Sequence, residues 1–157
     1  MRKRLSLYIL FCLPVVSNAQ FTNKFTPDFY AVIDTSKLKK VALSCNDSEL
    51  KDIKKCWIIS FRDINILENN FKKIHKYFSG DKVDSLSLFT FQYLGVLRNS
   101  DRCIYINAFP TRDMAKWERI NWKTEPINIC GGGESFWRAL FNIETREFIY
   151  LEFNSPK

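Results

Sequence analysis

The sequence has little of what metal and cofactor sites require. It contains one histidine, His75, and none of its five cysteines forms a Cys-x-x-Cys pair. Structural zinc sites take four Cys or His ligands, usually with two of them only a few residues apart. Phosphate-cradling glycine loops lead into a helix and carry a lysine, serine or threonine at a set spacing, and no such motif is present. The sequence therefore predicts neither a metal site nor a cofactor.

Glycine and proline are also scarce, with five of each in 157 residues. Low-complexity and collagen-like chains are much richer in both. Aromatic residues make up 15% of the chain and include 14 phenylalanines, which supply large side chains for a hydrophobic core. We find no internal repeat and no interior linker, so the length predicts a single domain over residues 20–157.

Basic residues outnumber acidic ones but are not concentrated. The chain has 24 Lys and Arg against 17 Asp and Glu, a net charge of +7. Three of the basic residues stand at positions 2–4, and no later run of basic residues is longer than two. Nucleic-acid-binding domains gather positive charge on one face or one element. The pattern predicts a mixed, solvated surface and no nucleic-acid partner.

Residues 1–19 have the pattern of a cleaved signal peptide. Three cations at 2–4 precede a mostly apolar run at 5–16, and small residues stand three positions and one position before a cleavage site that precedes Gln20. The run is too short to span a bilayer, which needs about 20 residues. We therefore expect a secreted or periplasmic protein with no transmembrane segment after cleavage. The alternatives are a buried N-terminal helix or strand, and a lipoprotein anchored at Cys12, whose bulky neighbour Phe11 fits such a site poorly.

Four cysteines remain once Cys12 is removed with the signal peptide. An even number of cysteines in an exported protein predicts disulfides, here two bridges with three possible connectivities. A Cys103–Cys130 bridge is favoured, because both residues flank strands in the C-terminal half. Four buried free thiols are the alternative. The candidates are Cys45, Cys56, Cys103 and Cys130.

The clearest secondary-structure signal is an amphipathic helix over residues 63–78. Ser60 and Asp63 predict a variant capping box at its start, and Gly80 is well placed to end it. Apolar residues recur at spacings of three and four, which places them on one stripe of a helix. The stripe consists of Ile64, Leu67, Phe71, Ile74 and Phe78.

The rest of the chain predicts mainly strands. Two hairpins are expected, and residues 112–119 predict a short helix. The short apolar runs at 29–33 and 41–44 could each be an edge strand. Together these elements predict an α+β domain, an antiparallel sheet of about four to six strands with one long amphipathic helix packed on one face. The predicted strands are 56–61, 86–97, 103–109, 135–141 and 147–153.

Two local features are candidate binding elements. The run Gly131, Gly132, Gly133 and Glu134 predicts either a structural loop beside Cys130 or a loop that helps to shape a binding surface, since glycine adopts backbone angles closed to other residues. Trp117 and Trp122 flank a helix-to-loop transition beside basic residues. If exposed, the two indoles predict an interface or a carbohydrate platform; if buried, they are core residues.

Several segments resemble a set of small exported proteins of Gram-negative bacteria to which no activity is assigned. The resemblance covers most of the chain after the signal peptide. It implies an exported location and a single α+β domain, and it implies no catalytic residues. The segments that carry it are 57–70, 92–95, 104–107, 130–133, Phe136-Trp137, Phe148 and Phe153-Asn154.

The sequence favours an exported non-enzymatic domain that binds a protein partner in the cell envelope, of the inhibitor, immunity or accessory type. The reasons are the lack of nucleophile, metal and cofactor signatures and the combination of an aromatic-rich sheet with a glycine-rich loop. A glycan-binding module and a small secreted hydrolase are the alternatives. The hydrolase needs His75 or two convergent carboxylates beside residues 131–134. Glu144, Glu147 and Glu152 on the final hairpin are not placed to converge.

Overall fold

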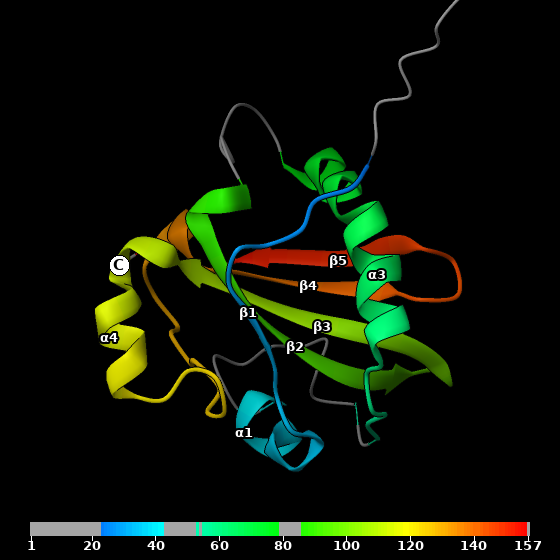
Figure 1. Cartoon of the computed structure of the whole chain (residues 1–157), viewed down its shortest axis with the longest axis horizontal. Coiled ribbons are helices and arrows are strands. Elements are labelled where there is room, and N and C mark those ends of the chain that lie inside the picture. The colour runs from blue at the N-terminus through cyan, green and yellow to red at the C-terminus, as the bar shows by residue number, and fades with distance from the viewer. Residues whose placement is uncertain (1–22, 43–52, 54, 79–85, 157) are drawn as a thin grey trace, which may run out of the picture.

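A computed structural model describes residues 23–42, 53, 55–78 and 86–156 (Figure 1). The predicted signal peptide lies outside the described residues. The strands are β1 Tyr30–Val32, β2 Phe89–Arg98, β3 Asp101–Pro110, β4 Trp137–Asn142 and β5 Glu147–Phe153. The α-helices are α1 Leu38–Ala42, α3 Phe61–Asn70 and α4 Met114–Arg119. Short 3-10 helices are η1 Thr35–Lys37, η2 Phe71–Tyr77, η3 Leu86–Leu88, η4 Thr111–Asp113 and η5 Gly133–Ser135.

The five strands form one sheet in the order β1-β2-β3-β4-β5. The α+β class and the strand number agree with the prediction, but the sheet is mixed rather than antiparallel. β1 runs parallel to β2, whereas the other three pairs are antiparallel. The long stretch of chain between β1 and β2, which includes α3, allows β1 to enter the edge in parallel, as a tight hairpin could not.

Both predicted hairpins form. β2 and β3 are joined at Asn99 and Ser100, whose φ angles are +50° and +75°. Two consecutive positive φ angles are typical of the two-residue turns that match the twist of a hairpin. α4 falls within the predicted helix 112–119. Of the two short apolar runs, the first contains β1, whereas Val41 belongs to helix α1, so the edge-strand interpretation is wrong there.

The predicted helix over 63–78 is instead two shorter pieces. α3 begins at Phe61 after a capping box in which Ser60 and Asp63 cap each other, as the sequence predicted. It ends after ten residues at Asn70, and the chain continues as the seven-residue 3-10 helix η2. Asn70 donates its side-chain Nδ2–H to the carbonyl of Ile66 over 2.8 Å, the kind of local bond by which Asn competes with regular helix. The expectation of one long helix on one face is therefore wrong.

The main hydrophobic core lies between the sheet and the α3–η2 segment. Ile64 and Leu67 of α3, and Phe71 and Ile74 of η2, are all at most 4% exposed. They join one cluster with buried residues of four strands, because alternate residues of a strand share one face. The strand members include Phe91, Tyr93, Ile104, Ile106, Ala139, Phe141 and Phe148.

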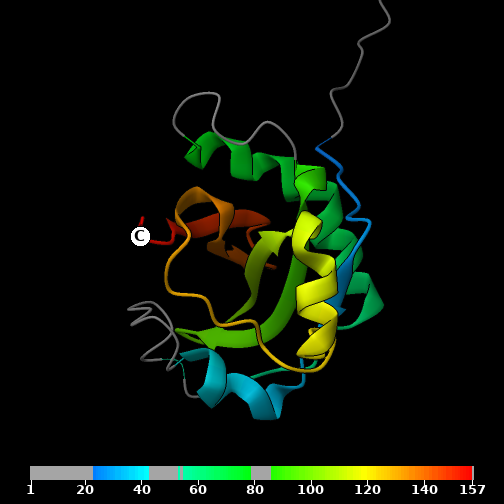
Figure 2. The ribbon, with the colours of Figure 1, turned by 90° about the vertical axis from the view of Figure 1, so that its left-hand side faces the viewer.

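The opposite face of the sheet is covered as well, which the sequence did not predict. Val41 of α1 packs with Leu94 and Leu140. Trp117 of α4 packs with Phe109 of β3 in a third cluster. Figure 2 shows α1 and the α3–η2 segment on opposite sides of the sheet. Because both faces are covered, β2, β3 and β4 are buried along most of their length rather than on alternate residues.

The predicted strand at 56–61 is only partly formed. Cys56 makes an isolated antiparallel bridge to Val96, and the amide of Trp57 donates to the carbonyl of Gly95. A Cβ atom at position 95 would lie 2.2 Å from the Trp57 carbonyl oxygen, so glycine is required for this close crossing. Within the described part of the chain, no helix is both long enough and apolar enough to cross a bilayer.

A candidate binding pocket at one end of the sheet

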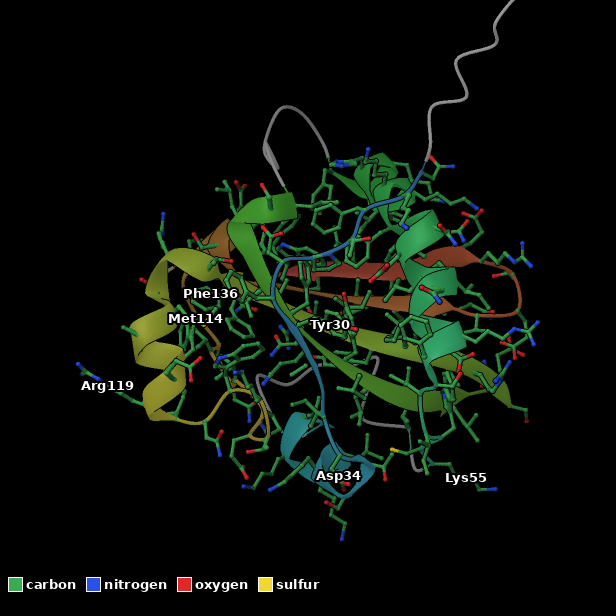
Figure 3. All side chains as sticks on the ribbon, viewed as in Figure 1. Tyr30, Asp34, Lys55, Met114, Arg119 and Phe136 are labelled. Carbon is green, nitrogen blue, oxygen red and sulfur yellow. The ribbon has the colours of Figure 1, made fainter. Side chains whose placement is uncertain are left out.

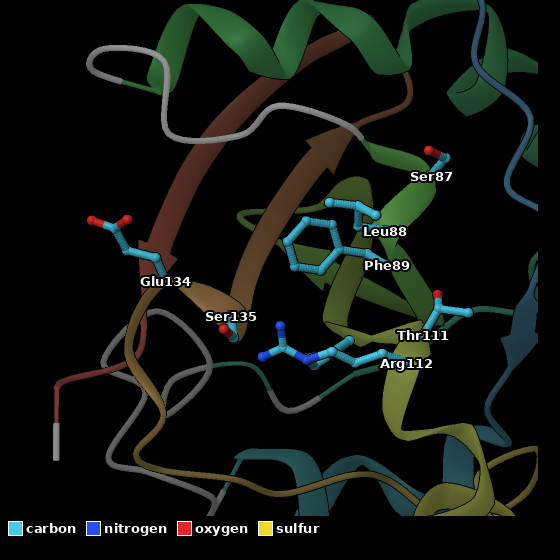
Figure 4. Close-up of a pocket in the computed structure, with 8 residues that line it drawn as sticks. Ser87, Leu88, Phe89, Thr111, Arg112, Glu134 and Ser135 are labelled. Carbon is cyan, nitrogen blue, oxygen red and sulfur yellow. The ribbon is translucent and has the colours of Figure 1, made fainter.

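A pocket of about 490 Å³ opens where three chain segments meet at one end of the sheet (Figure 4). The segments come before β2, after β3 and before β4, and the antiparallel order of these strands brings their ends together. The volume lies in the range of small-ligand sites, about 300–1,000 Å³. The pocket is lined by Ser87, Leu88, Phe89, Pro110, Thr111, Arg112, Glu134 and Ser135.

The apolar part of the lining includes one leucine side chain that is unusually exposed. Leu88 has 60% of its surface exposed although it precedes a strand of the core. Phe89 is partly buried, and its ring meets the ring of Trp137 edge-on at 5.6 Å. The wall therefore combines a ring held by the core with a free leucine side chain, which an apolar ligand group could cover.

Arg112 supplies the positive charge of the pocket. Its guanidinium makes no hydrogen bond or ion pair with any residue that the structure describes, and the side chain is exposed. Figure 4 shows Arg112 extending across the pocket toward Ser135, while Glu134 points away from it. Thr111, the preceding residue, is held by a 3.1 Å hydrogen bond between its hydroxyl and that of Thr90, which sets where the chain leaves β3. A guanidinium without a partner is suited to bind a carboxylate.

The glycine run directly precedes the opposite rim of the pocket, which is formed by Glu134 and Ser135. Gly132 and Gly133 have φ angles of +93° and +59°, a region that other residues rarely adopt. A Cβ at Gly132 would lie 2.7 Å from the ring of Phe136. Asn154 directly follows β5, and its Nδ2–H donates to the carbonyl of Gly131 over 3.1 Å. This hydrogen bond fastens the glycine run to the end of β5. This geometry places Glu134 and Ser135 at the pocket.

Trp117 and Trp122 are not part of this surface. Of the two interpretations, burial in the core is correct and the exposed platform is wrong, because Trp117 is 0% exposed and Trp122 is 2% exposed. Both rings meet Phe109 edge-on, and the Trp117 indole donates to the carbonyl of Pro110 over 2.9 Å. The sequence showed that the two tryptophans have basic neighbours, but it did not show that they pack against the second face of the sheet. Buried in this way, the two indoles offer no platform for a sugar.

The cysteines also differ from the prediction. Cys56 and Cys103 are free thiols, so the favoured Cys103–Cys130 bridge is wrong. Cys103 points into the core beside Leu94 and Leu140, whereas Cys130 lies exposed in the loop before the glycine run. Burial, followed by the charge of Asp101, raises the pKa of the Cys103 thiol to about 11. Because Cys56 and Cys103 are both free, none of the three two-bridge connectivities is present, and the prediction of two disulfides is wrong. Cys45 lies outside the described residues.

The groups that a hydrolase would need are dispersed. His75 lies on η2 and does not line the pocket; partial burial, followed by the charge of Lys72, lowers its pKa. Glu144 accepts a bond from Arg102, and Glu147 accepts from two lysines of η2. In the described ranges, no group of three or more His, Cys, Asp or Glu side chains is arranged to hold a metal ion.

Sequence reasoning missed most of the pocket. Only Glu134 was named beforehand, while Arg112 and Leu88 were passed over as parts of a helix and a strand. The position of Arg112, two residues after Pro110 at the end of an apolar strand, was the one available signal for the charged group. Leu88 carries no signal, because an apolar residue at the start of a strand is most often buried.

Comparison with known proteins does not identify a relative. No protein-family model matches the chain, and neither the curated proteins nor the solved structures show a significant match. The functional argument therefore depends on the geometry of the site.

Proposed function

We propose that the protein is an exported, non-enzymatic domain that binds a protein partner in the cell envelope through the pocket around Arg112. The observation that carries the proposal is that a guanidinium without a partner among the described residues shares one cavity with the exposed side chain of Leu88 and the partly buried ring of Phe89. Signal-peptide character of residues 1–19 supports the exported location. The mature domain is the range 20–157.

The chemistry of the wall defines the ligand. Arg112 can form two parallel hydrogen bonds with one carboxylate, which supplies both charge neutralisation and orientation. Leu88 and Phe89 lie on the β2 side of the same cavity and can cover an aliphatic or aromatic group. A segment of a partner that presents an acidic residue, or its own terminal carboxylate, next to a large apolar residue satisfies both sides.

The rigidity of the frame supports recognition rather than turnover. The pocket joins the ends of three paired strands, and the glycine run that precedes its rim is fastened to the end of β5 by Asn154. A preformed site loses little conformational entropy when it binds. Among the described residues, the pocket lining has one carboxylate, Glu134, and no histidine, so no observation favours the hydrolase alternative over binding.

The decisive experiment places a photo-activatable amino acid at position 88 in the exported protein and irradiates the producing cells. We expect a specific cross-link to one envelope protein. The same amino acid at position 120 is the matched control, because Ile120 is also apolar and exposed, at 49%, but lies beyond α4 and outside the pocket. The cross-linked protein is then purified, and its affinity for the mature domain is measured directly.

Replacing Arg112 by alanine should weaken that affinity about tenfold or more, because a charged hydrogen-bonded pair is worth about 1.5–3 kcal/mol. Arg119→Ala removes an exposed arginine from the other end of the same helical region and should leave the affinity unchanged. Figure 3 shows Arg119 directed away from the body of the protein. Equal cross-linking at positions 88 and 120, or equal affinity of the Arg112→Ala variant and the wild type, would refute the proposal.

A further inference from the structure

A second pocket, of about 420 Å³, lies at the other end of the strands, where β3 begins and β4 ends. It lies between the first turn of α3 and the β4–β5 turn. Its lining differs from that of the Arg112 pocket because charged side chains dominate it. The lining residues are Ser60, Arg62, Asp63, Ile66, Arg102, Ile143, Glu144 and Arg146.

Both carboxylates in this second pocket are already engaged. Asp63 accepts bonds from the amide and the hydroxyl of Ser60, and its other oxygen lies 3.7 Å from Arg102. Glu144 accepts a 2.9 Å bond from Nε of Arg102. Their negative charges are thus matched by the cap of α3 and by a single arginine.

Two guanidinium groups are left over. Arg62 and Arg146 both line the pocket, and neither guanidinium makes a hydrogen bond or an ion pair with any described residue. Three arginines against two carboxylates leave the pocket with an excess positive charge. Like charges held near one another repel, and an anion that bridges them relieves that repulsion.

Arg102 gives the site a fixed centre. Its guanidinium lies over the ring of Trp57, 5.0 Å from the centroid, and is bonded to Glu144 at the same time. The Trp57 indole is itself anchored by bonds to the carbonyls of Val96 and Cys103. Only part of the five-donor guanidinium is used by these contacts, so N–H groups remain for a ligand.

From these contacts we infer that the pocket of Arg62, Arg102 and Arg146 is a binding site for a phosphate group. Guanidinium forks match the oxygens of phosphate and can bind them in pairs. This pocket and the Arg112 pocket lie at opposite ends of the strands. The phosphate group is therefore a ligand separate from the protein partner proposed for the Arg112 pocket.

The surroundings of the site allow two sources for the phosphate. Phe61 lies between the lining residues Ser60 and Arg62 and is 77% exposed, one of the most exposed large apolar side chains in the described chain. Apolar side chains beside a cationic pocket are typical of a protein that docks on a phospholipid surface. A soluble phosphorylated molecule would use the arginines alone, so Phe61 distinguishes the two sources.

The first test titrates the full mature protein with inorganic phosphate at constant ionic strength. Calorimetry measures the binding, and NMR monitors the arginine Nε–H and tryptophan Nε1–H groups during the titration. We expect saturable binding, with the Trp57 indole signal shifting because Arg102 stacks on its ring. Arg62→Gln and Arg146→Gln should each weaken binding about tenfold, since each removes a charged hydrogen-bond donor. Arg119→Gln, on an exposed surface outside the pocket, should bind as the wild type does.

The second test uses vesicles of phosphatidylcholine with and without phosphatidylglycerol. Binding only to the anionic vesicles, weakened both by Arg146→Gln and by Phe61→Ser, assigns the phosphate to a lipid headgroup. Binding of inorganic phosphate that Phe61→Ser leaves unchanged, with no vesicle binding, assigns it to a soluble ligand. Absence of binding to both probes overturns the inference, as does binding to either probe that the Arg62→Gln and Arg146→Gln variants retain at full strength. Thermal unfolding of each variant shows whether it is folded.

Discussion

Gln92 and Asn107 stand opposite each other on β2 and β3, and Asn107 donates its Nδ2–H to Oε1 of Gln92 over 3.1 Å. The same Gln92 oxygen accepts the backbone N–H of Ile127, and its Nε2–H₂ group donates to the carbonyls of Trp122 and Glu125. One glutamine side chain thereby supplies hydrogen-bond partners to three main-chain groups of the loop after α4. Buried main-chain groups need such partners, since each unsatisfied one is costly.

Replacing Gln92 by leucine should therefore destabilise the protein by about 3 kcal/mol. Leucine fills a similar volume but leaves the amide of Ile127 and the carbonyls of Trp122 and Glu125 without partners. Urea unfolding measures the change in the free energy of unfolding. Asn128→Ala is the control: it removes an exposed bond to the Lys40 carbonyl and should change stability by less than about 0.5 kcal/mol. Equal stability of both variants would contradict the role given to Gln92.

Gly95→Ala should separate the segment at Trp57 from β2. The new Cβ would lie 2.2 Å from a main-chain oxygen, which cannot rotate away as a side chain could. Overpacking of this kind costs about 1–3 kcal/mol. The shift should also expose Trp57, so its fluorescence should move to longer wavelength in the folded variant. An unchanged spectrum together with an unchanged unfolding midpoint would show that the crossing is not close.

Alkylation can test the cysteine assignments. Cys103 is fully buried and its thiol pKa is raised to about 11, so it should resist iodoacetamide in the native protein at pH 8. In denaturant without reductant, Cys56 and Cys103 should both become labelled, because both are free thiols. If Cys45 and Cys130 are paired, they should react only after reduction. Mass spectrometry of the digested protein locates each label, and labelling of Cys103 only after reduction would contradict its free state.

The packing of α1 should depend on pH through Glu125. Hydrogen bonds from Lys37, and next from Lys40, lower the pKa of the Glu125 carboxyl to about 2. Because the pKa is lowered on folding, the stabilising effect of the carboxylate is present above its ordinary pKa of 4.5 and is lost as the pH falls through about 2. NMR titration of the Glu125 carboxyl should show this low midpoint.

Matched variants identify the lysine responsible. Lys37→Gln should raise the Glu125 midpoint toward its ordinary value. Lys39→Gln lies on the exposed side of α1, makes no bond to Glu125, and should leave the midpoint where it is. A midpoint near 4.5 in the wild-type protein would show that neither lysine holds Glu125 in solution.

Local sequence signals predicted local structure well. The capping box at Ser60 and Asp63 formed as expected, because its two bonds join residues only three apart. The turn at Asn99 and Ser100 and the pairing of β2 with β3 likewise follow from neighbouring residues. The same reasoning failed at Asn70, where a side-chain bond to Ile66 accompanies the change from α-helix to 3-10 helix.

The candidate sites were predicted far less completely. The glycine run was recognised because consecutive glycines indicate backbone angles that other residues rarely adopt, and Gly132 and Gly133 do have positive φ angles. The burial of Trp117 was not visible, since it depends on α4 covering the far face of the sheet. The pockets around Arg112 and Arg146 are made of residues that are distant in sequence, and no single segment marks either one.

The sequence by itself determined the class of the domain, the start of its central helix, its two hairpins and its unusual glycine loop, because each depends on the preferences of a few adjacent residues. Only the tertiary structure decided that β1 joins in parallel, that both faces of the sheet are covered, and which charges are left without partners. The physical reason is that burial and pairing are properties of contacts between distant segments. Arg62 and Arg146 are ordinary surface arginines in sequence, and they become a candidate site because the fold places both beside Arg102 while its carboxylate neighbours are already engaged.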